Sequence, residues 1–131
     1  MAFCFRKGCA NMGKLISLKN REFQTVYESG VSFANRNLVM YVLPNELTDN
    51  RIGISVSKKV GNSVVRHRVK RIIRESYRLN RDNVKNGLDI VIIARKEAKE
   101  KSYQELEQSM MHLYRLHRIS THIVNKVKNE S

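Results

Sequence analysis

Three segments of the chain have the apolar patterns of β-strands. Residues 38–43 are a short continuous apolar run, and within 51–57 every second residue from Ile52 is apolar. The polar residues 44–50 between them predict a hairpin loop that joins two antiparallel strands. Residues 88–94 are apolar throughout, which is typical of a strand that is buried on both faces.

Three other segments have the period of amphipathic helices. The first follows Asn20, a residue suited to capping a helix, and we expect it to end at Gly30. The second covers about 63–80, and the third begins where Ser102 and Glu105 fit a capping box. A strand–helix–strand unit joined to an antiparallel hairpin predicts an α+β fold with two layers, a mixed sheet packed by helices.

The helix expected over 63–80 separates into an apolar arc and a basic arc at about 100° per residue. The residues placed toward the core are Val65, Val69, Ile72, Ile73 and Ser76, with Tyr77 at the edge of the arc. Those placed outward are Arg66, His67, Lys70, Arg71, Arg74 and Arg78. Arg68 falls on the far flank near Glu75, where it is either partly neutralised or reaches a second surface.

The charge of the chain indicates what kind of ligand the basic arc binds. The chain of 131 residues has 25 Lys and Arg against 12 Asp and Glu, for a net charge of +13. A charged helix face is usually just solvated, but here like charges lie four residues apart and cations occupy the first turns, where the helix dipole disfavours them. Binding of a polyanion compensates for both costs, so we expect a nucleic acid as partner.

Aromatic residues bear on which nucleic acid is bound. Phe23 and Tyr27 share one helix face, and Tyr41 lies on an expected neighbouring strand. Three rings near a basic groove would form a stacking platform for an unpaired strand. Burial in an ordinary core is the alternative explanation of their spacing, and it is favoured for Phe23.

The sequence contains no familiar constellation for protein-based hydrolysis. Asp49, Asp82 and Asp89 are not arranged as paired acids that could hold two metal ions about 4 Å apart. The histidines at 112, 117 and 122 are spaced by five, so neighbours lie about 140° apart on a helix and share no ligand face. Cys4 and Cys9 lack a second ligand pair for zinc and favour a reducing compartment over a disulfide scaffold.

One segment resembles the signature of the protein subunit of bacterial ribonuclease P, which reads G-x-A-V-x-R-N-x-[IV]-K-R-x-x-R-E. Residues 61–75 read GNSVVRHRVKRIIRE, and they depart from the signature in having Ser63 for Ala and His67 for Asn. Further agreement lies, in order, in residues 22–27, 34–36 before the strand at 39–41, 54–59 and 92–95. The resemblance covers roughly residues 15–118.

The resemblance implies an element order of αβββαβα, a mixed four-stranded sheet and a left-handed strand–helix–strand crossover. It also implies that a separate RNA is the catalyst, that magnesium is held mainly by that RNA, and that the complex removes the 5′ leader of precursor tRNA by hydrolysis. By motif position, the residues expected to bind the catalytic RNA are Lys59, Arg66, His67, Arg68, Lys70, Arg71 and Arg74. Those expected to bind the single-stranded leader are Phe23, Tyr27, Arg36, Tyr41 and Lys58.

The domain bounds, the localisation and the partners can also be predicted. Residues 1–13 are expected to be a disordered extension, with Met12 as a possible alternative start, 14–118 the domain, and 119–131 a basic frayed tail. We expect a cytoplasmic protein with no membrane segment and no obligate protein partner, whose partners are the catalytic RNA and precursor tRNA. Two other classes share the charge pattern: a ribosomal or chaperone-like RNA-binding module, and a DNA-binding protein with the basic helix in the major groove.

Overall fold

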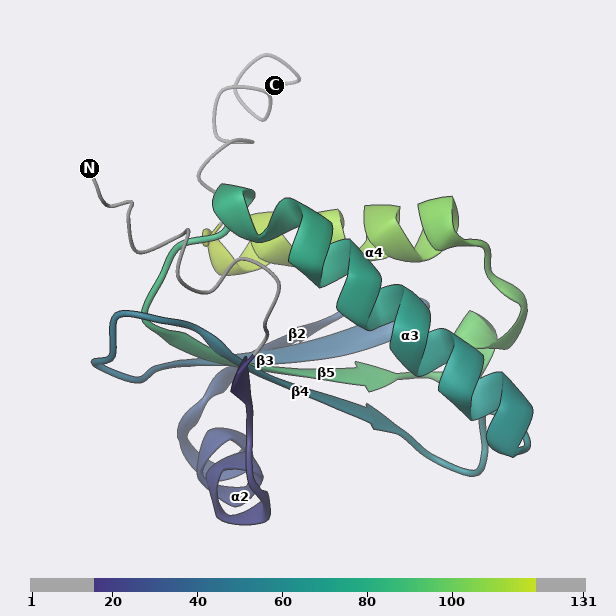
Figure 1. Cartoon of the computed structure of the whole chain (residues 1–131), viewed down its shortest axis with the longest axis horizontal. Helices are drawn as coiled ribbons and strands as arrows, with labels where there is room; N and C mark the ends of the chain where they lie inside the picture. The colour runs from purple at the N-terminus through teal and green to yellow at the C-terminus, as the bar shows by residue number, and fades with distance from the viewer. Residues whose placement is uncertain (1–15, 120–131) are drawn as a thin grey trace.

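The computed structural model describes residues 16–119, which form one sheet with helices on both of its faces (Figure 1). The strands are β1 (Ile16–Ser17), β2 (Val31–Ala34), β3 (Leu38–Pro44), β4 (Arg51–Val56) and β5 (Leu88–Ala94). The helices are α2 (Asn20–Ser29), α3 (Ser63–Asn80) and α4 (Tyr103–His117), with 3₁₀ turns η1 (Arg81–Asn83) and η2 (Lys96–Glu100). Apart from β1, the helices and strands follow the expected order αβββαβα.

The strand pairing differs from the expected hairpin. The order across the sheet is β1-β4-β5-β3-β2, so β5 lies between β3 and β4. It pairs antiparallel with β3, with Leu38 opposite Ala94, and parallel with β4, with Arg51 opposite Asp89. The prediction that 44–50 closes a hairpin between paired strands is therefore wrong; the antiparallel hairpin is β2–β3, with Val31 opposite Val42.

The sheet has five strands where four were expected. The additional strand, β1, has two residues and pairs parallel with the start of β4, Ile16 opposite Arg51. Two residues are too few to show an alternating pattern, so periodicity could not reveal this strand.

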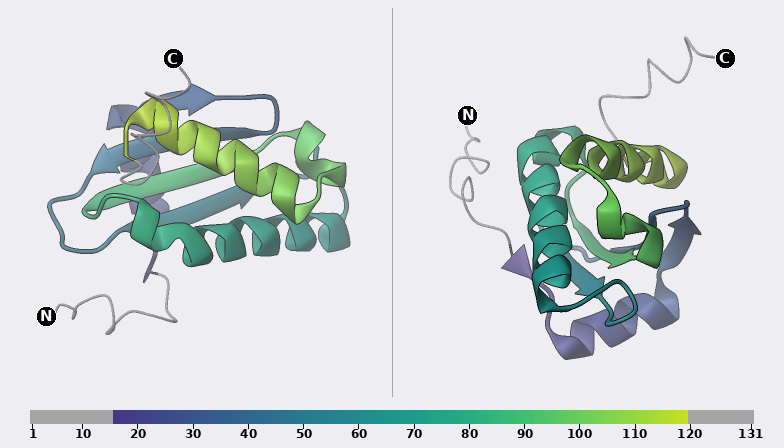
Figure 2. Two further views of the ribbon diagram at one scale, coloured as in Figure 1. Left: turned by 90° about the horizontal axis from the view of Figure 1, so that it is seen from above. Right: turned by 90° about the vertical axis from the view of Figure 1, so that its right-hand side faces the viewer.

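The helices divide between the two faces of the sheet. Figure 2 shows α3 and α4 side by side on one face and α2 on the other. The larger core fills the α3–α4 side and includes Met40, Ile73 and Leu113, whereas the core under α2 consists of Leu18, Val26 and Val91. In Figures 1 and 2, α3 returns above the sheet so that the β4–α3–β5 connection is left-handed, as the resemblance implies and against the usual right-handed rule.

Local sequence explains where the helices begin. Asn62 accepts a hydrogen bond from the Val65 N–H at 3.0 Å and caps α3, and Ser102 and Glu105 form the expected capping box of α4. Gly30 ends α2 as expected, but Asn20 is its first residue and Lys19 occupies the cap position. These differences of one residue are ordinary at helix ends.

The core face of α3 agrees with the helical wheel except at its edge. Val69, Ile73 and Ser76 are buried, and Tyr77, which was placed at the margin, is buried as well at 3% exposure. Across the described residues 16–119, no helix has the length and apolarity needed to span a bilayer. The expected extension at 1–13 lies outside these residues, as does the expected tail at 119–131 except for Ile119, which is 5% exposed and belongs to the larger core rather than to a frayed tail.

Candidate nucleic-acid interface

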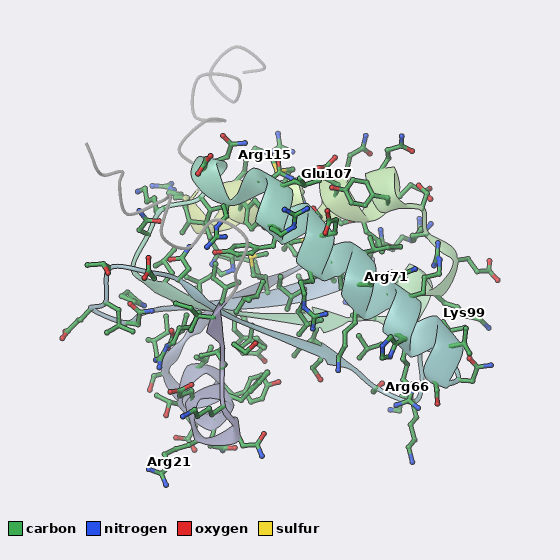
Figure 3. The ribbon with its side chains drawn as sticks, viewed as in Figure 1. Arg21, Arg66, Arg71, Lys99, Glu107 and Arg115 are labelled. Carbon is green, nitrogen blue, oxygen red and sulfur yellow. The ribbon has the colours of Figure 1, made fainter. Side chains whose placement is uncertain are left out.

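The outward flank of α3 presents cations that have no acidic partner. Arg66, Lys70, Arg71 and Arg74 form no ion pair with any residue between 16 and 119. Figure 3 shows Arg66 at the first turns of α3 and Arg71 further along the same helix. Like charges four residues apart on a helix repel each other, so a row of unpaired cations along one helix favours an anionic ligand. We call these four residues the α3 flank.

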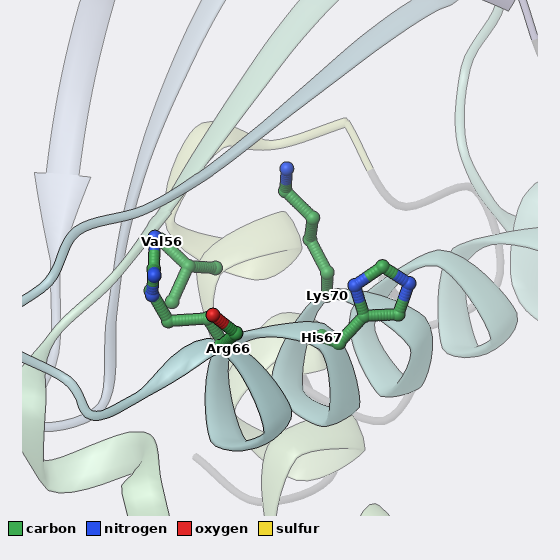
Figure 4. Close-up of a pocket in the computed structure, with 5 residues that line it drawn as sticks. Val56, Arg66, His67 and Lys70 are labelled. Carbon is green, nitrogen blue, oxygen red and sulfur yellow. The ribbon is translucent and has the colours of Figure 1, made fainter.

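A hollow of about 250 Å³ lies between the first turns of α3 and the end of β4. Val56, Ser63, Arg66, His67 and Lys70 line it. Figure 4 shows the Arg66, His67 and Lys70 side chains extending from the same stretch of α3, with Val56 next to Arg66. The Nε atom of Arg66 is buried and has no hydrogen-bond partner among the described residues. This concentration of donors is suited to the oxygen atoms of a phosphate.

Two other arginines of α3 already have partners within the protein. The guanidinium of Arg68 donates to the carbonyl oxygens of Lys99 at 3.3 Å and Lys101 at 2.8 Å, and so ties α3 to the end of η2. Neutralisation of Arg68 by Glu75, one of the two expectations for it, is not observed, because Glu75 pairs with Arg78. Arg78 pairs with Glu75 and holds the pKa of that carboxyl below its usual value.

The aromatic residues meet on the opposite face of the sheet. The Tyr27 ring lies 6.1 Å from Phe23 and 5.1 Å from Tyr41, centroid to centroid. Burial and the neighbouring Tyr41 raise the pKa of Tyr27, while a hydrogen bond with Ser55 opposes the shift. The Phe23 ring lies so close over Gly53 that a Cβ atom there would be 2.4 Å from Cζ. The rings are part packing and part surface, because Tyr27 remains 38% exposed.

Beyond these rings, part of the sheet is left open. The row Ala34–Val39–Ile93–Ser55 crosses four strands, and all four residues are partly or fully exposed. Figure 1 shows β4 and β5 running past α2 toward this end of the sheet. We call the three rings together with this row the α2-side cleft.

Basic side chains flank the open end of this cleft. Arg36 lies in the turn between β2 and β3, and Lys58 follows β4; both are exposed. Lys59 is exposed next to Lys58, on the way to the cap of α3. Sequence reasoning missed Gly53, Ser55 and Ile93, although the alternation in β4 identified the opposite face of the same strand.

The acidic and histidine side chains have structural contacts. Both carboxylate oxygens of Asp89 accept from Arg51, and Oδ1 also accepts from Asn45 at 2.8 Å. A His117 ring nitrogen lies 2.9 Å from the Met40 carbonyl oxygen, and burial lowers the pKa of this histidine. Within residues 16–119, no three His, Cys, Asp or Glu side chains are grouped as metal ligands. His122, Cys4 and Cys9 lie outside the described residues.

An open mixed sheet with aromatic rings on one side and unpaired cations on the other is typical of a small basic α+β protein that binds nucleic acid. Residues 14–118 match the sequence profile of the family described as Ribonuclease P. The chain therefore belongs to the ribonuclease P protein family.

Individual relatives agree with this assignment. The chain is 62% identical over 104 residues to the ribonuclease P protein component of Lachnoclostridium phytofermentans, covering 79% of this chain and 90% of that protein. It is 55% identical over 97 residues to that of Alkaliphilus metalliredigens, covering 74% and 87%. Among solved structures, the Staphylococcus aureus RNase P protein aligns with a TM-score of 0.73 at 38% identity, covering 79% of this chain and 94% of that chain. The Thermotoga maritima protein aligns at 0.70 and 28%, covering 75% and 94%.

Proposed function

We propose that this protein binds the catalytic RNA of ribonuclease P through the α3 flank and the unpaired 5′ leader of precursor tRNA through the α2-side cleft. Family membership supplies the reaction, hydrolytic removal of the leader from precursor tRNA. The division between the two surfaces rests on one observation: the α3 flank has cations without ion-pair partners among residues 16–119, whereas the other face has rings beside an open part of the sheet.

The α3 flank is suited to a folded RNA backbone. Phosphate binding by unpaired cations is insensitive to base sequence and is strengthened by release of counterions. Arg66, His67 and Lys70 line the hollow, and Lys59, Arg71 and Arg74 extend the positive surface along the chain on either side. Arg68 serves this surface indirectly if it keeps its bonds to η2, because those bonds fix the rotation of α3.

The α2-side cleft is suited to an unpaired strand. Bases that are not paired can stack on Tyr27 or Tyr41, and the row through Ile93 offers an apolar floor. Arg36 and Lys58 at the open end would neutralise the phosphates of the same strand. A duplex presents no free base faces, so this cleft favours the leader over the body of the tRNA.

The chain itself supplies positioning and charge neutralisation rather than the attacking water. Asp89 is already held by Arg51 and Asn45, which leaves it unsuited to coordinate a catalytic ion. We propose that magnesium is held by the RNA, where it would activate the water, and that the complex acts in the cytoplasm. Cations of the protein would reduce repulsion between the two RNAs as they approach.

The proposal is tested by a cleavage assay with the protein alone, the cognate RNA alone, and both together. We expect cleavage at the leader junction only when the RNA is present, and the protein to lower the KM for precursor tRNA. Cleavage by the protein alone would contradict the division of labour.

Leader length provides a second test of the cleft. Affinity of the protein–RNA complex is expected to rise as leader nucleotides are added to mature tRNA and then to level off. Equal affinity for mature and precursor tRNA would instead identify a general RNA-binding module, and equal competition by duplex DNA would favour the DNA-binding class.

A further inference from the structure

Arg51, the first residue of β4, connects three elements of the fold. Its Nε and Nη2 donate to the two carboxylate oxygens of Asp89 on β5, at 2.8 and 2.7 Å. Its Nη1 donates to Oε2 of Glu22 on α2 at 2.6 Å. The hydrogen bond with Asp89 is the main reason that the pKa of Arg51 is raised. Because Asp89 is only 4% exposed, this contact is anchored in the interior rather than on a mobile surface.

The Glu22 end of this contact fixes the start of α2. Its other oxygen, Oε1, accepts from the backbone N–H of Lys19 at 2.8 Å and closes the first turn. Glu22 thus uses one oxygen to cap α2 and the other to bind the sheet. The next residue, Phe23, places its ring on Gly53, two residues along β4 from Arg51.

Apart from the packing of the Phe23 and Tyr27 rings, few contacts hold α2 in place. It has ten residues, and Val26 is the only one of them that is buried. A helix of this length is marginal by itself, and one buried valine contributes only about 1.5–3 kcal/mol. The ion pair with Arg51 is the only salt bridge between α2 and any other described residue. The height of the first turn of α2 over the sheet therefore depends on the contact between Arg51 and Glu22 together with the packing of Phe23.

We propose that Arg51 and Glu22 are positioning residues that set the width of the α2-side cleft without contacting RNA themselves. This inference rests on the proposed function of the cleft. Loss of the Glu22 contact would let the first turn of α2 move, and Phe23 and Tyr27 would move with it. The Arg51–Asp89 pair would remain, so β4 and β5 would keep their pairing.

The sharpest variant is Glu22→Gln in the full chain bound to its catalytic RNA. Glutamine preserves the capping box through its carbonyl oxygen, but its amide NH2 takes the place of Oε2, where it cannot accept from Arg51, and the charge of the ion pair is lost. We expect the preference for precursor over mature tRNA to fall by roughly five- to tenfold, within the range of couplings measured between contacting residues. Affinity for mature tRNA is expected to stay unchanged.

A matched control and a mutant cycle separate positioning from general destabilisation. Glu107→Gln removes a carboxylate that accepts from Asn80 at 2.8 Å on the opposite side of the sheet, and is expected to leave the preference unchanged. In a Tyr27→Ala background, Glu22→Gln is expected to have little further effect, because the ring it positions is gone. Additive losses, or equal losses with Glu107→Gln, would overturn the inference.

The outcomes distinguish this inference from the proposed function. If Tyr41→Ala abolishes the precursor preference and a folded Glu22→Gln retains it, the positioning role is wrong and the cleft stands. If the unmodified protein shows no precursor preference, the proposed function itself fails. Should Glu22→Gln unfold, Glu22→Asp, which keeps the charge but is one methylene shorter, provides the same comparison under the same criteria.

Discussion

The α3 flank and the α2-side cleft differ in what their side chains already contact. On the flank, Arg66, Lys70, Arg71 and Arg74 have no ion-pair partner within residues 16–119. In the cleft, Tyr27 contacts Phe23 and Tyr41 and has a hydrogen bond with Ser55. The flank is therefore characterised by cations without ion-pair partners, and the cleft is characterised by aromatic rings that pack against one another.

This difference predicts two kinds of RNA binding. Contacts between cations and phosphates weaken steeply with salt, because binding releases condensed counterions. Stacking of bases on aromatic rings depends on free base faces and responds weakly to salt. Variants that affect only one of the two properties test whether the surfaces are separate.

The largest effect is expected from Arg66→Ala, Lys70→Ala and Arg74→Ala combined. Each phosphate contact contributes about 0.7–0.9 to the slope of log affinity against log salt, so the slope for the catalytic RNA should fall by roughly 2–3. Affinity at low salt should fall by about 100-fold or more, while the preference for precursor over mature tRNA is retained. Filter binding across a salt series measures both quantities.

The control for this variant is Arg78→Ala on the same helix. Arg78 is already paired with Glu75, so its loss should change the slope much less than the loss of an unpaired cation. A slope that changes equally for Arg78→Ala would show that protein partners do not distinguish the cations of α3.

Tyr41→Ala is expected to have the next largest effect, and it should weaken leader binding rather than change the salt dependence. Loss of a stacked base should cost about 1–3 kcal/mol of leader binding, with no change in the salt slope. Tyr41→Phe keeps the ring and should retain most of that binding. Affinities for precursor tRNA with and without its leader measure the effect, and a loss shared equally by both substrates would remove Tyr41 from the leader site.

Gly53→Ala should perturb the cleft through packing. The added Cβ would lie 2.4 Å from Cζ of Phe23, so the ring must move. Because Phe23 is only partly buried and can shift, we expect a loss of about 1 kcal/mol in stability, at the low end for overpacking. The midpoint temperature of thermal unfolding and the affinity for the leader should both decrease. Phe23→Leu in the same chain should restore much of the stability.

The smallest effect is expected on the pH dependence of folding stability, and it comes from a residue outside both surfaces. Burial lowers the pKa of His117 below its ordinary value of about 6.5. In the range between the two values the unfolded chain binds more protons than the folded protein, so stability should rise with pH through that range and fall as the pH drops below about 6.5. His117→Gln should flatten this dependence in urea unfolding at pH 5 and 7; an unchanged pH dependence would exclude His117 as its source.

The sequence was most informative where a period decides the structure. Helical spacing predicted the extent of α3 and most of its buried residues, and the Ser102–Glu105 spacing predicted the start of α4. The same pattern predicts which face of a strand is buried but not which strand lies beside it, so it could not place β5 between β3 and β4. That placement depends on contacts between Leu38 and Ala94, far apart in the chain.

The site residues were likewise predictable where one helix carries them and not where their partners are distant in the sequence. The spacing of Arg66, Lys70 and Arg74 predicted their common surface, because one helix carries them. The partners of Arg68 are 31 and 33 residues away, and those of Arg51 lie on two other elements, so no local pattern could reveal them. Only the fold separates the arginines with protein partners from those without.

The separation of the two surfaces is tested most directly by NMR titration of the full chain with two RNAs. A short unpaired oligoribonucleotide is predicted to shift the amide signals of Tyr27, Tyr41 and Ser55, and an RNA duplex those between Ser63 and Arg74. Shifts by the unpaired oligoribonucleotide confined to α3, or the same set of shifts for both RNAs, would contradict the account.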